Sequence, residues 1–465
     1  MKELSIITFP FIPPEQVFNL LKNNSHFIWL DSCLNNRRDY SLMACNPFLL
    51  FKSKKKKISI RENGMEKLYE GQPLNVLHEL MEEYRIPPTS FFAPGALGYF
   101  SYDLGCQIET LPDISTDDLN MPDIYLGFYE MVILFDHKRK NIRLISMDVR
   151  GSKQREFESL SRNLAAQLKT ISLQKEKMEE VSFTIDKISS NITYREYIKA
   201  VKKIKSYIAA GDVYQINFSR RIEAEGVFPA DRLYLKLRKV NPTSFSGFFD
   251  TGDFCILSNS PELFIKKKGC MITSLPMKGT RPRGKNKKED NRYASQLLLS
   301  EKDKAELIMI VDLERNDMGK VCKYGSIRVE NIRNLEKYRT VFQTTSLIKG
   351  RLTKGLGQVD LLKAVFPGGS ITGAPKIRAM EIIEDIEPNK RAFYTGSMGY
   401  LGFNGNMELN ILIRTLLLKG RHLYYPVGGG IVWDSVPDEE FEETQTKAKA
   451  LFLALGYESE KFISF

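Results

Sequence analysis

Apolar and polar residues are patterned differently along the chain, and the difference predicts distinct kinds of structure. Over roughly the first 140 residues, short apolar runs such as Phe48–Phe51 and Met131–Phe135 are separated by turn-forming pairs, Asn35-Asn36 and Pro87-Pro88 among them. Short apolar runs bounded by Asn and Pro are typical of β-strands joined by tight turns. This region is therefore expected to be rich in strands, and no cluster of chemically reactive residues stands out in it.

Between residues 151 and 190 the composition becomes polar. Gln154–Lys177 carries Leu160, Leu164 and Leu168 at helical spacing, and a stretch containing Ser, Asn and Lys follows up to Asn191. Leucines four residues apart share one helix face, whereas a stretch of the second kind favours an irregular connection. The sequence predicts a helix and a connecting segment.

From Tyr194 onward, amphipathic helical patterns alternate with β-branched runs and glycine-rich turns, a texture typical of an α/β catalytic region. The stretch Glu301–Val311 is predicted to be helical. Asp303 and Glu306 are three residues apart in it and must share one face.

A second predicted helix, Glu439–Leu455, follows Pro437 and also carries carboxylates on one face. The residues that share this face are Glu440, Glu443 and Lys447. Two such helices could converge on one Mg²⁺ ion, which prefers a few carboxylate oxygens and keeps water or substrate oxygens in its other positions. Spacing alone favours the alternative, in which acidic pairs are solvated helix faces or partners of nearby lysines.

Composition and charge narrow the class of protein. The chain has 465 residues, of which 42% are hydrophobic and 27% charged, so a folded globular protein is expected rather than a disordered or fibrous one. The net charge of +11 favours anionic partners. The basic run Lys54–Lys57 has no interleaved aromatic residue and is interpreted as a solvated hairpin edge, so nucleic acid is not an expected partner.

Cysteine usage and apolar run lengths indicate the compartment. The six cysteines are scattered without any C-x-x-C, so their spacing encodes neither a zinc site nor a disulfide framework. Pro10, Pro13 and Pro14 interrupt the apolar stretch near the N-terminus, and the longest apolar runs, such as Leu307–Val311, are far shorter than a membrane span. A cytoplasmic protein with no membrane partner is expected.

Glycine-rich turns surround lone basic residues in the second half of the chain. They are Pro276–Arg281 (PMKGTR), Pro367–Lys376 (PGGSITGAPK) and Gly428–Gly430. The second is not a phosphate-binding Walker loop, because Ala-Pro stands where that loop needs Gly before Lys. Each turn taken singly is a tight turn that needs positive φ, although its backbone N–H groups also suit a carboxylate.

Taken together and in order, these motifs resemble the chorismate-utilising enzymes, a family of Mg²⁺-dependent enzymes, over roughly residues 190 to 455. The stretches that carry the resemblance are Gly211–Ser219 (GDVYQINFS), Ser260–Phe264 (SPELF), Pro276–Thr280, Ala305–Asp317 (AELIMIVDLERND), Phe366–Met380 (FPGGSITGAPKIRAM), Ile413–Thr415 and Gly428–Thr444.

The resemblance implies a fold and a domain organisation. The implied fold is an α/β (α+β) body of two packed, largely antiparallel sheets with helices outside. An N-terminal accessory region would span residues 1–150, a helix and connecting segment 151–190, and the chorismate-binding catalytic domain 191–465. In relatives the accessory region can hold tryptophan, but the match at Leu30-Asp31-Ser32 is too short to predict this.

Two positions point to the reaction type within the family. Isochorismate and salicylate synthases resemble one another in having a lysine base where Gln215 stands; an amide cannot deprotonate water, so ammonia is the expected nucleophile. Lys278 lies in a stretch similar to the P-I-K-G-T of aminodeoxychorismate synthases, whereas anthranilate synthases carry alanine there. The resemblance thus implies amination of chorismate at C4, a step toward para-aminobenzoate and folate.

The family's roles carry over to matching positions of this chain. Glu262 would be the general acid and Lys278 a covalent nucleophile, which must lose its proton through burial or through cations such as Mg²⁺ and Arg281. Arg414, within an apolar stretch expected to be a buried strand, would bind the enolpyruvyl carboxylate. The other implied substrate contacts are Gln215, Thr280, Tyr394, Gly429, Gly430 and Lys447. The implied Mg²⁺ ligands are Glu306 and Glu443, with Asp303 and Glu440 reached through water.

One departure from the family pattern concerns histidine. Relatives often have H-x-x-S near the ring, whereas Gln343 precedes Thr344 here, and none of the four histidines falls in a matching motif. Gln343 is a candidate hydrogen-bonding substitute for that histidine.

The source of ammonia is expected to be a partner. No cysteine lies in a G-x-C-x-G turn of the kind a glutamine amidotransferase needs, so the resemblance implies a separate amidotransferase subunit. The alternatives are anthranilate synthase component I, disfavoured by Lys278, and a non-catalytic basic binding protein on the same fold. The second is disfavoured because all the residues expected to carry the chemistry are present.

Overall fold

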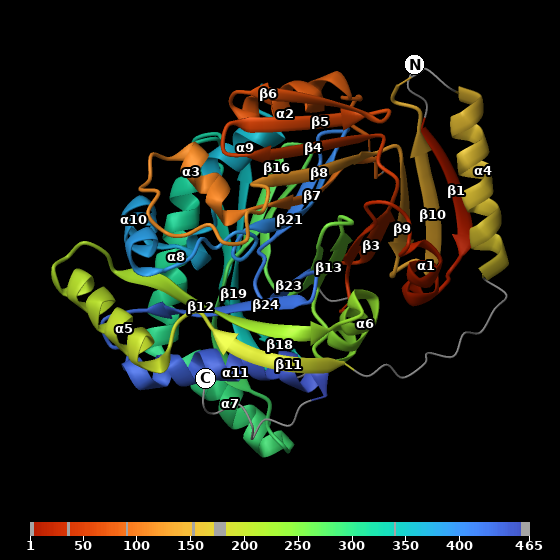
Figure 1. Cartoon of the computed structure of the whole chain (residues 1–465). Helices are drawn as coiled ribbons and strands as arrows, with labels where there is room; N and C mark the ends of the chain where they lie inside the picture. The colour runs from red at the N-terminus through yellow and green to blue at the C-terminus, as the bar shows by residue number, and fades with distance from the viewer. Residues whose placement is uncertain are drawn as a thin grey trace.

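The computed structural model describes residues 4–34, 38–89, 92–150, 154–171, 183–338 and 341–456. In this part of the chain two 12-stranded sheets lie against each other, and helices cover their outer faces (Figure 1). Every strand pairing recorded within the two sheets is antiparallel, from β1–β10 to β7–β8. The fold predicted from the sequence is confirmed.

The first sheet contains strands from the N-terminal, central and C-terminal parts of the chain. In spatial order they are β1 (Leu4–Pro10), β10 (Asn141–Met147), β9 (Met131–Asp136), β3 (Tyr40–Ala44), β2 (Ile28–Asp31), β13 (Phe245–Asp250), β14 (Cys255–Ser260), β23 (Thr415–Lys419), β24 (His422–Ile431), β12 (Gln215–Val227) and β11 (Thr184–Ser190), with β20 (Gly373–Ala374) beside β12.

The second sheet is assembled in the same mixed way. Its order is β17 (Met277–Pro282), β19 (Val341–Arg351), β16 (Met271–Leu275), β15 (Leu263–Lys268), β22 (Met407–Asn410), β21 (Ser397–Gly402), β7 (Gly95–Phe100), β8 (Ile124–Tyr129), β4 (Leu49–Lys54), β5 (Lys57–Glu62) and β6 (Met65–Glu70), with β18 (Arg328–Lys337) beside β19. The basic run near residue 55 forms the turn of the β4–β5 hairpin as expected, but β6 and not this hairpin is the edge of the sheet.

Helices pack on the outer faces of both sheets. In the described ranges the α-helices are α1 (Pro14–Leu21), α2 (Pro73–Glu83), α3 (Gly105–Ile108), α4 (Gln154–Ile171), α5 (Tyr194–Ala209), α6 (Ala230–Val240), α7 (Lys287–Leu299), α8 (Glu301–Gly319), α9 (Gln358–Val365), α10 (Lys376–Ile386) and α11 (Pro437–Leu455), and the short 3₁₀ helices are η1 (Tyr102–Leu104) and η2 (Gly369–Ile371).

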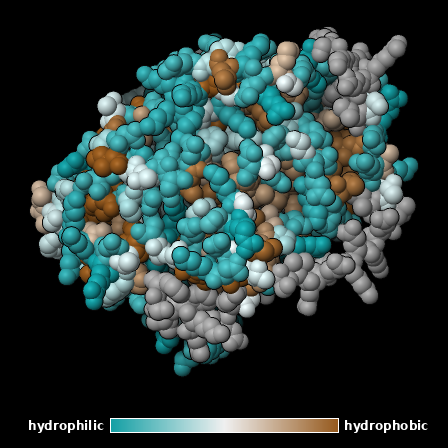
Figure 2. Space-filling model, viewed as in Figure 1, coloured by the Kyte–Doolittle hydropathy of each residue, from teal (hydrophilic) through white to brown (hydrophobic). Residues whose placement is uncertain are grey.

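The hydrophobic core has three main layers. A central cluster joins residues of both sheets, such as Leu30 and Leu417 from the first and Leu97 and Tyr400 from the second. One outer cluster lies between the first sheet and helices α1, α4, α6 and α11, and the other lies between the second sheet and α2, α8 and α9. The visible surface is mostly hydrophilic, with hydrophobic residues in small separate patches (Figure 2). Among the described residues, none of the helices has both the length and the apolar character needed to cross a bilayer.

Local sequence explains why the site-bearing helices begin where they do. The side chain of Ser300 accepts a hydrogen bond from the backbone N–H of Asp303 and caps the start of α8. Helix α11 has Pro437 in its first turn and ends at Gly456, whose φ of 84° suits glycine. The predicted helix after Pro437 is confirmed, and α8 is longer than the predicted Glu301–Val311.

The structure confirms one of the two predictions for residues 151–190 and differs from the other. The helix predicted to begin at Gln154 is present as α4, and residues 172–182, which include the predicted end of the helix at Lys177, lie outside the described residues. The segment expected to be irregular up to residue 190 ends instead in strand β11, which pairs with β12. Its Thr184 to Ser190 residues form a strand because a long neighbour supplies hydrogen-bond partners, which local composition does not reveal.

Candidate active site

Most of the residues expected to act in catalysis converge where the ends of β12, β17 and β24 meet helices α8 and α11. Glu262 immediately precedes β15, Lys278 lies on β17, and Gln215 begins β12. Gly429 and Gly430 lie near the end of β24, which pairs with the start of β12. These residues are far apart in sequence, and the strand pairings bring them together.

Glu262 is a buried carboxyl group that accepts a short hydrogen bond from Ser370. Its side chain is 4% exposed, and the Ser370 hydroxyl of η2 donates to its Oε1 at 2.7 Å. Burial raises the pKa of Glu262 to about 7, against the hydrogen bond from Ser370 and the charge of Lys278, which lower it. A carboxyl group in this setting holds its proton near neutral pH, as a general acid must.

The amino group of Lys278 points toward the same turn. Its Nζ lies 3.4 Å from the carbonyl oxygen of Ser370, and its own carbonyl accepts a hydrogen bond from Thr344 of β19 at 2.6 Å. Burial lowers the pKa of Lys278, while the charges of Glu306 and Glu262 raise it. An amine with a depressed pKa is a better nucleophile at neutral pH.

Gly279 produces a local irregularity that orients Lys278. It has a φ of 71°, and the β17–β19 register shifts between Lys278 and Thr280. A Cβ atom at residue 279 would lie 2.9 Å from Oδ1 of Asp303. Glycine is therefore required both by the backbone conformation and by the close approach of α8.

Gln215 and Gly430 form the wall beside this amine. Gln215 is fully buried, and neither its amide oxygen nor its amide nitrogen has a hydrogen-bond partner among the described residues. A Cβ atom at residue 430 would lie 2.8 Å from Nε2 of Gln215 and 3.5 Å from Nζ of Lys278. An unpartnered buried amide next to a buried amine is a feature of a ligand-binding site, since such groups are normally hydrogen-bonded.

Helix α11 brings two carboxylates and a lysine to Gly429. Lys447 forms an ion pair with Glu443 at 2.6 Å and donates to the carbonyl of Gly428 at 2.7 Å, and the hydroxyl of Ser435 donates to Glu440 at 2.6 Å. The ion pair with Lys447 lowers the pKa of Glu443, whereas burial raises that of Glu440.

The same α11 side chains explain the glycine at residue 429. A Cβ atom there would lie 3.4 Å from Oε2 of Glu440, 3.6 Å from Oε1 of Glu443 and 3.7 Å from Nζ of Lys447. The absence of a side chain at this residue leaves room between the strand and the helix.

Helix α8 supplies the opposite carboxylates. Burial raises the pKa of Glu306, and Glu443 adds to this through like-charge repulsion. Asp303 forms an ion pair with Arg281 at 2.9 Å, so Arg281 neutralises Asp303 and is not the cation that depresses the pKa of Lys278; Lys447 is.

The carboxylates are the kind of donor group that Mg²⁺ prefers, but their side chains are not already arranged around a common metal position. Glu306 and Glu443 interact across the site, and an all-carboxylate set of donors suits Mg²⁺, which often binds one or two carboxylates and fills its other positions with water and substrate. No group of three or more His, Cys, Asp or Glu side chains in the described part of the chain is arranged to hold a metal ion.

Arg414 interacts electrostatically with Glu262 and has no carboxylate within 4 Å among the described residues. Burial lowers its pKa, and the charge of Glu262 is one of the groups that oppose this. The prediction that Arg414 lies in a buried strand is wrong: its φ is 51°, and β23 begins one residue later, at Thr415. The apolar residues around it are buried as expected, but the left-handed backbone excludes it from the strand.

The remaining predicted residues lie on neighbouring elements. Tyr394 is buried in the turn between α10 and β21. Thr280 is exposed and accepts a hydrogen bond from Nε2 of Gln343 at 3.3 Å, whereas Oε1 of Gln343 has no partner within the described ranges. Gln343 therefore lies beside β17, one residue from Thr344, the partner of Lys278.

Comparison with known proteins assigns this site to a family. A sequence profile described as chorismate binding enzyme matches residues 25–453. The chain belongs to the chorismate-binding enzyme family.

Members with two different names resemble this chain over most of its length. Aminodeoxychorismate synthase component 1 of Bacillus subtilis is 38% identical over 96% of this chain and 95% of its own length. Anthranilate synthase component 1 of Acetivibrio thermocellus is 35% identical over 95% and 92%. The crystal structure of anthranilate synthase component I from Streptococcus pneumoniae superimposes with a TM-score of 0.79 at 33% identity, covering 89% of this chain and 92% of that one.

The motif residues Glu262, Lys278 and Gln215 lie close together, but the contacts that support them are not evident from the motifs. Ser370 was not predicted, although it contacts both Glu262 and Lys278. A serine within the glycine-rich turn PGGSITGAPK was the available signal, because such a turn brings its side chain and carbonyl close to neighbouring groups.

Proposed function

We propose that this protein is aminodeoxychorismate synthase component I, which converts chorismate and ammonia to 4-amino-4-deoxychorismate on the route to para-aminobenzoate and folate. The observation that carries the proposal is Lys278, a partly buried amine beside Glu262 and Gln215 with a lowered pKa. Aminodeoxychorismate synthases resemble this chain in having a lysine there, and two relatives of that name are 38% and 36% identical to it.

The two residues supply complementary proton chemistry. Neutral Lys278 attacks C2 of chorismate, the ring double bonds shift, and the C4–O bond breaks as Glu262 protonates the departing hydroxyl, which leaves as water. Ammonia then attacks C4, the double bonds shift back, and the C2–N bond to Lys278 breaks. The lysine nitrogen loses a proton after the first attack and regains one as it leaves C2. The new ammonium nitrogen at C4 also loses a proton, and this proton restores the acid form of Glu262.

Chorismate carries two carboxylates, and the site offers separate groups for them. Arg414 has a planar guanidinium with no carboxylate partner within 4 Å among the described residues, which suits the enolpyruvyl carboxylate. Tyr394 and the backbone of Gly430 are proposed to complete this contact, as they do in the family's pattern. Gln215 has an amide donor and an amide acceptor without partners among the described residues, and both suit the ring substituents. Thr280, Gly429 and Lys447 complete the proposed substrate contacts.

Magnesium is proposed as the cofactor. Glu306 and Glu443 would hold the ion, with Asp303 and Glu440 reached through water, and the bound ion would neutralise the ring carboxylate of chorismate. Without the ion, Glu306 and Glu443 repel the anionic substrate, so the chain's own carboxylates give a reason for metal dependence.

The proposed partner is a glutamine amidotransferase subunit that supplies ammonia. The relatives' names, with their numbered component, support a second component. The net charge of +11 is compatible with an acidic partner or with attraction of the dianionic substrate.

Anthranilate synthase component I is the second candidate, and the similarity to enzymes of that name favours it. Both enzymes would use Glu262 and the same carboxylates. Lys278 distinguishes them, since a nucleophilic side chain at C2 blocks ammonia from that carbon.

The deciding experiment identifies the product. Purified protein with chorismate, Mg²⁺ and ammonium is expected to make 4-amino-4-deoxychorismate, identified by chromatography with mass detection. Anthranilate and pyruvate as main products would overturn the proposal, and isochorismate would also overturn the interpretation of Gln215.

A second experiment tests the covalent route. When ammonium is scavenged, protein incubated with chorismate and Mg²⁺ should gain mass on the peptide containing Lys278, detected by intact-protein and peptide mass spectrometry. Lys278→Ala should gain none and should turn over more slowly with ammonium. Full aminodeoxychorismate formation by that variant would make Lys278 an electrostatic residue beside direct attack by ammonia.

A further inference from the structure

The turn that carries Tyr394 has an unfavourable backbone conformation at two residues. Ala392 has a φ of 50° and Thr395 a φ of 57°, and neither is glycine. Residues with a Cβ atom rarely adopt this region, and a residue held there is strained. Other contacts must therefore hold the turn in place.

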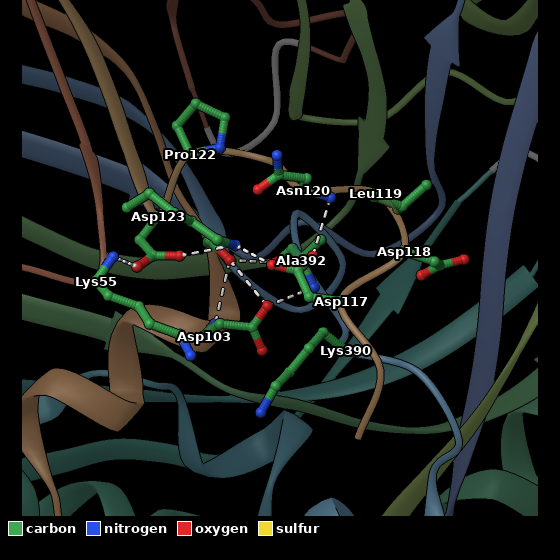
Figure 3. Close-up of polar contacts among 12 residues, drawn as sticks. Lys55, Asp103, Asp117, Asp118, Leu119, Asn120, Pro122, Asp123, Lys390 and Ala392 are labelled. Carbon is green, nitrogen blue, oxygen red and sulfur yellow. Dashed lines mark hydrogen bonds and ion pairs between the residues drawn. The ribbon is translucent and has the colours of Figure 1, made fainter. Parts of the chain in front are cut away.

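A segment from the N-terminal third of the chain forms hydrogen bonds with both the backbone N–H and the backbone carbonyl of Ala392 (Figure 3). The backbone N–H of Ala392 donates to Oδ2 of Asp103 at 2.9 Å. Its carbonyl oxygen accepts from the backbone N–H of Tyr102 at 2.9 Å and from the hydroxyl of Ser101 at 2.8 Å. Three consecutive residues, the cap Ser101 and the first two residues of η1, thus bind one alanine that is distant in the sequence. Ser101 and Ala392 are 291 residues apart.

The other end of the turn is fixed to the catalytic centre. Arg391 is buried, pairs with Glu387 and donates to the carbonyls of Ile371 and Asn217 at 2.8 and 2.6 Å. Ile371 follows Ser370, the donor to Glu262. Asn217 lies two residues after Gln215 on the same strand. The turn is therefore rigid at Arg391 and depends on η1 at Ala392.

We propose that Asp103 is a positioning residue for the chorismate pocket: by accepting the N–H of Ala392 it holds the strained turn in the conformation that presents Tyr394 to the substrate. This inference rests on the proposed function, in which Tyr394 contacts the enolpyruvyl carboxylate. Asp103 itself does not touch the reacting atoms.

The surroundings of Asp103 raise the pKa of its carboxyl group. It faces Tyr102 on its own element, Cys106 of α3, Asp123 before β8, Lys54 of β4 and Lys390 after α10. Burial and Asp123 raise the pKa of Asp103 to about 7, and the two lysines lower it. At pH 7 the carboxyl group is therefore partly protonated, and an amide of the same shape is the neutral replacement that keeps an oxygen acceptor.

The test compares three variants by steady-state consumption of chorismate, which does not depend on which product is formed. Asp103→Ala removes the acceptor and should raise the KM for chorismate about tenfold with kcat within about twofold, since a substrate contact of equal strength in ground and transition states is lost. Asp103→Asn keeps an oxygen acceptor for the Ala392 N–H and should retain the wild-type KM at pH 7. Asp117→Asn is the matched control, because Asp117 lies in the same cluster but pairs with Lys54 and the N–H of Asn120 and does not contact the turn.

A purely structural role gives a different pattern. If Asp103 only stabilises the fold, Asp103→Ala should lose active protein, seen as lower kcat at unchanged KM, and that result overturns the proposal. If Asp103→Ala does not fold, Ser101→Ala, which removes one of the two donors to the Ala392 carbonyl, should raise KM severalfold, and an unchanged KM overturns the proposal. Formation of anthranilate by the wild type would refute the proposed function. The comparison of KM values would still test the role of Asp103, because it measures chorismate consumption and not the product.

Discussion

At the scale of single residues, the site contains an acid and a base whose ordinary protonation states are both shifted by burial. The pKa of Glu262 is raised to about 7 and that of Lys278 is lowered. Both shifts favour the neutral form of the group. An acid that can donate and an amine that can attack are therefore present together near neutral pH, as the proposed reaction requires.

This arrangement predicts how activity depends on pH. The reactive form of Glu262 is protonated, so kcat should fall as the pH rises through about 7 when rates are expressed per concentration of unprotonated ammonia. On the acid side, kcat should fall as Lys278 gains a proton. The measurement is kcat for chorismate consumption between pH 5.5 and about 9 with saturating substrate.

A variant assigns the alkaline limb of this profile. Glu262→Gln keeps the acceptor for Ser370 but has no proton to donate, so kcat should fall by about 10²–10⁴-fold and the alkaline limb should disappear. An unchanged alkaline limb in this variant would show that another group titrates there.

Residues in motifs could be predicted from the sequence, and their supporting contacts could not. Glu262 and Lys278 belong to recognisable stretches, whereas the Ser370–Glu262 hydrogen bond joins residues 108 positions apart. Asp103 lies in no motif, and its proposed positioning role depends on the φ of Ala392, which composition does not disclose. Such contacts depend on strand pairing across the whole chain.

At the scale of elements, α8 and α11 position the carboxylates proposed to bind Mg²⁺. Glu306→Gln and Glu443→Gln should each lower activity at least about 100-fold, and excess Mg²⁺ should restore little, because the site loses charge as well as geometry. Asp303→Asn should be milder because Asp303 already pairs with Arg281. Activity is measured as chorismate consumption over a Mg²⁺ titration.

Helix α11 offers a control beside the residue under test. Glu442 is exposed and adjacent to Glu443 but lies outside the set of residues facing Gly429. Glu442→Gln should retain wild-type activity and Mg²⁺ dependence. Near-normal turnover by Glu443→Gln at ordinary Mg²⁺ would rule out Glu443 as a ligand.

Helices were easier to predict from the sequence than strands, for a physical reason. A helix makes its hydrogen bonds within itself, so its apolar period and its caps are local, as at Ser300 and Pro437. Strand β11 exists because β12 pairs with it, and Arg414 is kept out of β23 by a left-handed backbone conformation. Neither fact is encoded in the residues that display it.

At the scale of the whole molecule, the first 150 residues are not an appended module. Strand β2 pairs with β13 in the first sheet, and β7 pairs with β21 in the second. A fragment that begins at residue 183 would lose the five strands at one end of each sheet and expose β13 and β21 as unpaired edges. It should be insoluble or unfolded and inactive.

Expression of this fragment, followed by circular dichroism and a chorismate assay, tests the expectation. The family resemblance implies that the catalytic domain begins at residue 191. A soluble fragment that consumes chorismate would contradict the expectation and show that the catalytic region folds independently.

The interleaved strand order also constrains how the protein is made on the ribosome. The N-terminal strands leave the exit tunnel with the edges of β2 and β7 unpaired, and their partners begin only at Phe245 and Ser397. Strand β24, which carries Gly429 and Gly430, must then insert between β12 and β23. The nascent chain therefore exposes open sheet edges through most of its synthesis, a state that favours aggregation and chaperone binding, and no catalytic centre can form until almost the entire polypeptide has emerged.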